Sequence, residues 1–158
     1  MRARIERIPQ REQTSQVPRP RGDGIYEVDA TWGAVQPLEL APGVRTVGEL
    51  EVIEHLDRGL PLVDTRLGEF HRGGTIPGAR WLCHEEVREH LDELDPGVPT
   101  VFFCNGPQCT ATPDAIRKLL DAGYPAGAIL YYRGGIHDWV TLGYPVIPGQ
   151  AASDEPFA

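Results

Sequence analysis

The stretch Thr100-Val-Phe-Phe-Cys104-Asn-Gly-Pro-Gln-Cys109-Thr-Ala-Thr112-Pro113-Asp114 predicts an apolar strand, a loop with two cysteines and the start of a helix. Residues 100–103 form the short apolar run that is typical of a buried strand. Thr112 suits the N-cap, Pro113 the first helical position and Asp114 the first turn. A thiol in such a loop lies near unpaired backbone N–H groups and the positive end of the helix dipole, which favour the thiolate and can bind an anion. The junction is therefore a candidate site of sulfur chemistry.

Helical and strand patterns alternate on both sides of this junction. Thr46 followed by Glu49 is a capping-box signature, so we expect a helix that starts there and ends at Gly59. Residues 60–63 and 128–132 read as further strands, and residues 85–94 as a further helix. This alternation predicts an α/β domain with a central, mainly parallel sheet flanked by helices. Because such sheets carry their sites at the carboxyl ends of the strands, Asp64 and Cys104 are expected to lie at the working edge.

The chain divides into three predicted parts. Residues 1–42 are rich in proline and lack a sustained apolar period, so we expect an N-terminal arm that is partly extended or packed on the body. Residues 43–148 form the α/β domain, and residues 149–158 form a short C-terminal tail.

Composition excludes several classes of function. The chain has 158 residues with 15 basic and 23 acidic side chains, which gives a formal net charge of −8. This balance argues against a nucleic-acid partner and against an anionic membrane surface, because both require a clustered basic face. Three cysteines are too few for a disulfide scaffold, and no apolar run is long enough for a membrane span. We expect a cytoplasmic protein with reduced thiols.

Four motifs appear in an order that resembles a rhodanese domain over about residues 43–147. They are Asp64-Thr-Arg66, Gly74-Thr-Ile-Pro-Gly-Ala79, the strand that ends in Cys104, and Arg133-Gly-Gly-Ile-His-Asp-Trp139. The loop is similar to that of a branch of single-domain rhodaneses with two loop cysteines. The resemblance implies a rhodanese-like fold and a sulfurtransferase without a cofactor. Its loop cysteine would take sulfane sulfur from a small donor such as thiosulfate, become a persulfide, and pass the sulfur to a thiol, a cyanide-like acceptor or a protein.

The resemblance assigns candidate roles to individual residues. Cys104 takes the nucleophile position at the strand end, while Cys109 is an alternative nucleophile, a resolving thiol, or simply a small buried side chain. Asp64 and Arg66 are expected to support the loop. The anion-binding loop would be formed by Asn105, Gly106, Gln108, Thr110, Ala111 and Thr112.

The loop departs from the family pattern in two ways. It is longer by about two residues, and the position of the usual arginine falls on Ala111 and that of the usual serine on Thr112. An alanine cannot offer the bidentate, permanently charged contact that a guanidinium gives an oxyanion, so we expect weakened binding of thiosulfate.

Three other functions fit parts of the sequence. A catalytically weak or inactive rhodanese-like module for binding or regulation is the main alternative, since the loop has lost its arginine. Phosphatase or arsenate-reductase chemistry is less favoured because it also depends on a loop arginine. Cys83, His84, Cys104 and Cys109 could supply zinc ligands, but they lack the closely spaced pairs of structural zinc sites, so we expect no metal.

For His71 and His84, surface or capping roles are favoured over a role as a base.

Overall fold

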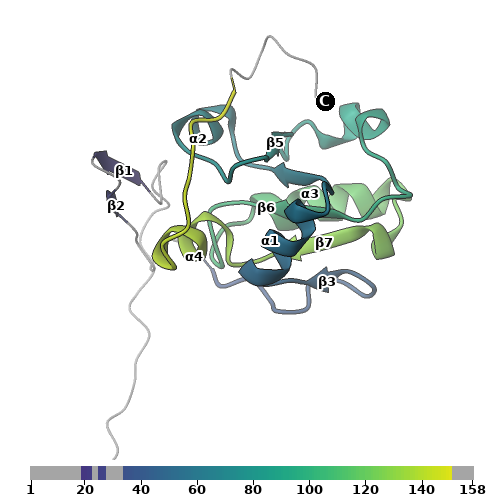
Figure 1. Cartoon of the computed structure of the whole chain (residues 1–158). Helices are drawn as coiled ribbons and strands as arrows, with labels where there is room; N and C mark the ends of the chain where they lie inside the picture. Colours follow the sequence, from purple (N-terminus) through teal and green to yellow (C-terminus); the bar gives the residue numbers. More distant parts are fainter. Residues whose placement is uncertain (1–18, 23–24, 28–33, 151–158) are drawn as a thin grey trace, which may run out of the picture.

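A five-stranded parallel sheet forms the centre of the domain in the computed structural model, which describes residues 19–22, 25–27 and 34–150 (Figure 1). The strand order is β3-β7-β6-β4-β5, and every neighbouring pair runs parallel. This architecture confirms the predicted α/β fold with a parallel sheet and flanking helices. The strands are β3 (Arg45–Thr46), β4 (Leu62–Asp64), β5 (Arg80–Trp81), β6 (Thr100–Phe103) and β7 (Ile129–Tyr132).

Helices cover both faces of the sheet. Helices α1 and α4 pack on one face, and α3 with the 3₁₀ segment η1 packs on the other. The bounds are α1 (Glu49–Asp57), α2 (Gly68–Gly73), η1 (Val87–Glu93), α3 (Ala111–Asp121), η2 (Ala126–Ala128) and α4 (Gly135–Thr141). None of the helices in the described part of the chain is long and apolar enough to cross a bilayer.

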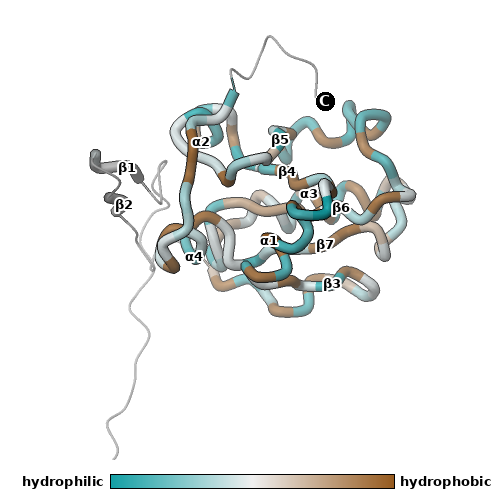
Figure 2. Tube along the Cα trace, viewed as in Figure 1, coloured by the Kyte–Doolittle hydropathy of each residue, from teal (hydrophilic) through white to brown (hydrophobic). Residues whose placement is uncertain are grey.

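Strand β6 is the centre of the hydrophobic core. All four of its residues are buried, which explains the uninterrupted run that predicted it, since a strand covered on both faces need not alternate with polar residues. Phe102 packs in the cluster under α3, whereas Phe103 packs in the cluster under α1 and α4. Figure 2 shows the hydrophobic stretches concentrated in the interior of the domain and mostly hydrophilic residues on the outer connections.

Two predicted helices differ from those observed. Helix α1 begins at Glu49, after Gly48, and the side chain of Glu51 accepts a hydrogen bond from the Gly48 N–H (3.3 Å), so the capping box predicted for Thr46 and Glu49 is wrong. Thr46 belongs to β3 because it pairs with β7. The helix expected over residues 85–94 is the 3₁₀ segment η1, which is interrupted by the non-helical backbone of His90.

Part of the expected arm contacts the domain. Leu40 and Ala41 pack against the core under α3. Residues 19–22 and 25–27 form β1 (Arg19–Gly22) and β2 (Ile25–Glu27), which pair antiparallel in a separate two-stranded sheet. Residues 1–18, 23–24, 28–33 and 151–158 lie outside the described residues, so the division into arm, domain and tail stays a prediction.

Candidate active site

The two cysteines face each other across the cysteine loop, residues 104–110, which connects β6 to α3. Cys104 follows β6 directly and is 2% exposed, and Cys109 is 3% exposed. The Thr112 N–H in the first turn of α3 donates a hydrogen bond to Sγ of Cys104 (3.4 Å). Sγ of Cys104 also lies 3.8 Å from the carbonyl oxygen of Cys109. The loop therefore surrounds both sulfurs with its own backbone.

The surroundings of Cys104 favour its thiolate. Burial raises the pKa of this thiol, but hydrogen bonds from the Cys109 thiol, from the hydroxyl and N–H of Thr112 and from the Gly106 N–H outweigh burial, so the pKa of Cys104 lies below its ordinary value. Donors aimed at a sulfur stabilise its charged form. Cys104 is therefore the more readily ionised sulfur of the pair.

Cys109 is its protonated partner. The hydrogen bond that its thiol donates to Cys104 raises the pKa of Cys109 well above the ordinary value, and burial and the charge of Cys104 raise it further. The backbone N–H groups of Ala111 and Asn105 oppose this rise. One proton shared between two adjacent thiols thus favours one thiolate and one hydrogen-bond donor.

A buried ion pair supports the loop from β4. Arg66 forms a bidentate pair with Asp64 (Nε–Oδ1 2.9 Å, Nη2–Oδ2 2.7 Å) and donates from Nη1 to the side-chain oxygen of Asn105 (3.1 Å). Thr75 donates to Asp64 (2.9 Å), and Nδ1 of His71 lies 3.0 Å from the same carboxylate. Burial opposes ionisation of Asp64, but Arg66 and His71 hold the pKa of this carboxyl well below its usual range. The charge network thus fixes the side chain of Asn105, the residue that follows Cys104 in the chain.

Backbone N–H groups of helix α4 donate hydrogen bonds to carbonyl oxygens of the loop. The N–H groups of Ile136 and His137 donate to the carbonyl oxygens of Cys104 (3.0 Å) and Asn105 (2.7 Å). This approach depends on Gly135, whose φ is +57°, because a Cβ there would lie 2.3 Å from the Cys104 oxygen. Gly135, the second glycine of the Arg133-Gly-Gly motif, is therefore required for this close packing of α4 on the loop.

Residues before the domain contact the tip of the loop. The Gln36 N–H donates to the Pro107 carbonyl (2.7 Å), and Nε of Arg133 donates to the Gln36 carbonyl (2.9 Å). Arg133, which directly follows β7, thus binds the segment before β3, and this segment in turn binds the cysteine loop.

The predicted loop residues separate into two groups. Asn105, Gly106, Ala111 and Thr112 supply N–H groups to the sulfurs, while Gln108 is half-buried and Thr110 is exposed. Helix α3 begins at Ala111 with Thr110 at the N-cap, so the predicted N-cap at Thr112 is wrong.

Distant contacts explain that difference. Oγ1 of Thr112 lies 2.8 Å from Oγ1 of Thr65, and either hydroxyl can be the donor of this hydrogen bond; Oγ1 of Thr65 lies 3.0 Å from the Phe103 carbonyl oxygen. Thr112 is fully buried with its hydroxyl against that of Thr65, and it lies in the first turn of α3, which starts at Ala111.

Three residues of the site are not predicted from the sequence: Thr65, Thr75 and His71. His71 is 2% exposed, so the surface role expected for it is wrong. His84 is half-buried and pairs with Asp114 (2.7 Å). A signal for Thr65 existed in the sequence, because it stands between Asp64 and Arg66 in the motif.

A different group of metal-ligand types lies beside the site. Among the described residues, the ligand atoms of Cys83, His84 and Glu85 come within 4.8 Å of one another, whereas Cys104 and Cys109 are not members of this group. The four residues that could supply zinc ligands are therefore not brought together among the described residues. Burial and the charges of Glu85 and Glu86 raise the pKa of Cys83, which disfavours its thiolate.

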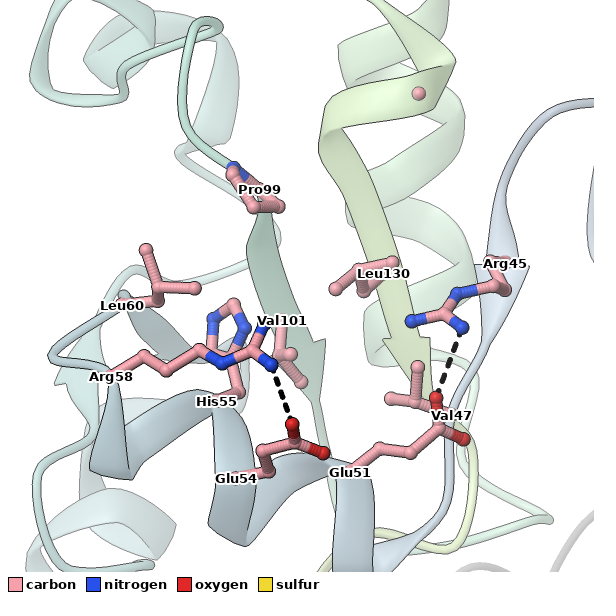
Figure 3. A pocket seen from close by; sticks show the side chains of 11 residues that line it. Arg45, Val47, Glu51, Glu54, His55, Arg58, Leu60, Pro99, Val101 and Leu130 are labelled. Carbon is pink, nitrogen blue, oxygen red and sulfur yellow. Dashed lines mark hydrogen bonds and ion pairs between the residues drawn. The ribbon is translucent and has the colours of Figure 1, made fainter.

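A cavity of about 490 Å³ lies at the opposite edge of the sheet from the cysteines. Figure 3 shows Pro99 and Val101, at the amino end of β6, on one side of it, with the ion pairs Arg58–Glu54 and Arg45–Glu51 along its rim. Cys104 follows the carboxyl end of the same strand, so this cavity is separate from the cysteine loop.

Comparisons with known proteins identify the family. The rhodanese-like domain family matches residues 49–142. The chain is 33% identical over 100 residues to the HTH-type transcriptional regulator Rv0324 of Mycobacterium tuberculosis (strain ATCC 25618 / H37Rv), a match that covers 63% of this chain and 43% of that protein. The chain thus spans less than half the length of this curated relative.

Two solved structures show the same fold. A thiosulfate sulfurtransferase from Pseudomonas aeruginosa is 25% identical with a TM-score of 0.58, covering 72% of this chain and 22% of that one. A rhodanese-related protein from Thermoplasma volcanium is 19% identical with a TM-score of 0.53, covering 65% of this chain and 97% of that one. With the family match extending over more than half of its length, the chain belongs to the rhodanese-like domain family.

Proposed function

We propose that this domain is a sulfurtransferase in which Cys104 carries sulfane sulfur as a persulfide. The observation that carries the proposal is the set of hydrogen bonds from Cys109, Thr112 and Gly106 that favour the Cys104 thiolate at the carboxyl end of β6. The thiolate attacks the sulfane sulfur of a donor, the donor's S–S or C–S bond breaks, and its remainder leaves with the electron pair. With thiosulfate, the leaving group is sulfite. An acceptor thiolate or cyanide then attacks the outer sulfur and restores the Cys104 thiolate.

The loop composition bears on the choice of donor. The loop resembles that of the two-cysteine branch of single-domain rhodaneses. In this chain, Cys109 is the second loop cysteine, and Ala111 leaves the arginine position without a cation. The neutral N–H groups of Ala111 and Asn105 are directed to Cys109, and those of Thr112 and Gly106 to Cys104. Since these donors already hold the sulfurs, a polysulfide or a small persulfide suits the site better than a doubly charged oxyanion. A cytoplasmic location supplies thiols that can serve as acceptors.

Cys109 is proposed as the resolving thiol. In the resting site it donates a hydrogen bond to Cys104, so it lies next to the sulfur that becomes the inner atom of the persulfide. Attack of Cys109 on that inner sulfur forms a Cys104–Cys109 disulfide and expels hydrosulfide, and a thiol reductant restores both cysteines. The raised pKa of Cys109 argues against its role as the first nucleophile.

A turnover assay tests the proposal. The full chain is supplied with thiosulfate, polysulfide or 3-mercaptopyruvate, with cyanide or a thiol as acceptor. We expect turnover with at least one donor and its loss in Cys104→Ser, and we expect polysulfide to be used better than thiosulfate. Retention of full turnover in Cys104→Ser together with loss in Cys109→Ser would reverse the assignment of the nucleophile.

A non-enzymatic role is the second candidate. Both cysteines are almost fully buried, and one relative of the chain is named as a transcriptional regulator, of which the chain matches 43%. These facts favour a domain that binds a partner or reports sulfur status without turnover. No product from any donor would select this candidate over the sulfurtransferase.

A further inference from the structure

Two adjacent tyrosines at the end of β7 are buried without hydrogen-bond partners. Tyr131 and Tyr132 are 0% and 1% exposed, and neither hydroxyl has a partner among the described residues. A buried hydroxyl left unpaired costs about 1–3 kcal/mol, so each such group requires an explanation. A ligand that pairs the hydroxyl is one such explanation.

The two side chains lie on opposite faces of the sheet. Tyr131 packs in the cluster under α3, and Tyr132 packs with Trp139 in the cluster under α4. Tyr131 pairs in register with Phe102, whose side chain points to the same face. Cys104 is two residues beyond Phe102 and accepts its hydrogen bond from Thr112 of α3, so its sulfur is on that face as well. The unpaired hydroxyl of Tyr131 therefore shares a face of the sheet with the cysteine pair.

The charges around each hydroxyl separate the two tyrosines further. Burial raises the pKa of Tyr131, and the charges of Cys104 and Cys109 raise it further, while Arg133 lowers it. Burial also raises the pKa of Tyr132, and the charges of Asp138, Glu49 and Tyr144 raise it further, but neither cysteine contributes. The Tyr131 hydroxyl is thus within the electrostatic field of both sulfurs and stays protonated, as a donor must.

We propose that the Tyr131 hydroxyl donates a hydrogen bond to the outer sulfur of a persulfide on Cys104. This inference rests on the proposed function. Persulfide formation moves the negative charge from Cys104 Sγ to a second sulfur about 2 Å away, at the length of an S–S bond. The N–H groups of Thr112 and Gly106 contact the inner sulfur, so the outer sulfur needs another donor. A phenol is a neutral donor, and here it takes the position of a charge-stabilising group that Ala111 does not provide.

The matched pair Tyr131→Phe and Tyr132→Phe tests the assignment. Each removes one buried, unpaired hydroxyl from the same strand, so we expect both variants to fold with unchanged or slightly raised stability. Loaded with polysulfide, only Tyr131→Phe should show slower alkylation of the Cys104 persulfide by iodoacetamide below the midpoint of its pH profile, by about tenfold, and this midpoint should move to higher pH, because the anionic outer sulfur is the nucleophile that displaces iodide. A structural role alone would leave the midpoint in place.

The outcomes separate this inference from the proposed function. If the unmodified chain forms a persulfide on Cys104 and the two variants have the same pH profile, the tyrosine assignment is overturned and the sulfurtransferase stands. If the unmodified chain forms no persulfide, both are overturned. Should Tyr131→Phe fail to fold, NMR of the ring Cζ signals in isotope-labelled unmodified protein decides. Loading with sulfur must then shift the Tyr131 signal and leave that of Tyr132, and the absence of this difference refutes the proposal.

Discussion

Replacing Cys109 with alanine should make Cys104 harder to ionise. The Cys109 thiol is the first of the hydrogen-bond donors that lower the pKa of Cys104, and alanine removes it without adding another donor. Burial of Cys104 remains, and it opposes the thiolate. The pKa of Cys104 should therefore rise in Cys109→Ala. The cause is the loss of a hydrogen-bond donor, because the substitution adds no negative charge near Cys104.

The size of the effect follows from the strength of one hydrogen bond to a charged group. Such a bond contributes about 1.5–3 kcal/mol. At about 1.4 kcal/mol for each factor of ten, the thiolate fraction of Cys104 at a pH below its midpoint should fall by roughly tenfold to a hundredfold. Cys109→Ser keeps a hydroxyl donor at this position, so it should recover part of the loss.

The assay is the pH dependence of Cys104 alkylation by iodoacetamide, assigned by peptide mass mapping. Cys83 is an internal reference in the same sample, since its pKa is raised by burial and by Glu85 and Glu86 rather than by the cysteine loop. An unchanged or lower midpoint for Cys104 in Cys109→Ala would refute the shared-proton description of the pair.

Three further predictions concern the support of the loop. Gly135→Ala should destabilise the fold by at least about 2 kcal/mol in urea unfolding, because its Cβ would meet the Cys104 carbonyl; Gly143→Ala, with positive φ but open space, should cost clearly less. Arg66→Met should destabilise by about 3–5 kcal/mol, since it leaves the buried Asp64 carboxylate without its guanidinium, and an unfolding midpoint close to that of the unmodified chain would contradict this. Because the folded-state pKa of Asp64 is depressed, its contribution to stability is present above the ordinary carboxyl pKa of about 3.9 and is lost as the pH falls further. Asp64→Asn should therefore flatten the loss of stability in acid, and an equally steep loss would show that other groups cause it.

The local sequence pattern predicts those parts of the fold that depend on residues close together in the sequence. Strand β6 is predictable because burial on both faces leaves an apolar run in the sequence. The position of Cys104 at the carboxyl end of the strand is predictable because this residue directly follows the run. Asp64 was placed at the same edge by the same rule, and the supporting role expected for it and Arg66 is consistent with the contact to Asn105.

The parts that local pattern could not predict depend on contacts between distant residues. Thr112 has a good N-cap side chain, yet its hydroxyl meets Thr65, 47 positions away, and the helix starts earlier. His71 looked like a surface residue because nothing near it in the sequence shows that it contacts the Asp64 carboxylate. The difference between Cys104 and Cys109 likewise arises from which N–H and S–H groups the folded loop directs to each sulfur.

Sulfur transfer through Cys104 is tested most directly by the mass of the intact chain and its peptides after exposure to a sulfane-sulfur donor. We expect one added sulfur atom on the Cys104 peptide, its loss in Cys104→Ser, and its persistence in Cys109→Ser, where the resolving thiol is missing. An adduct that survives in Cys104→Ser and disappears in Cys109→Ser, or no adduct from any donor, would contradict this account.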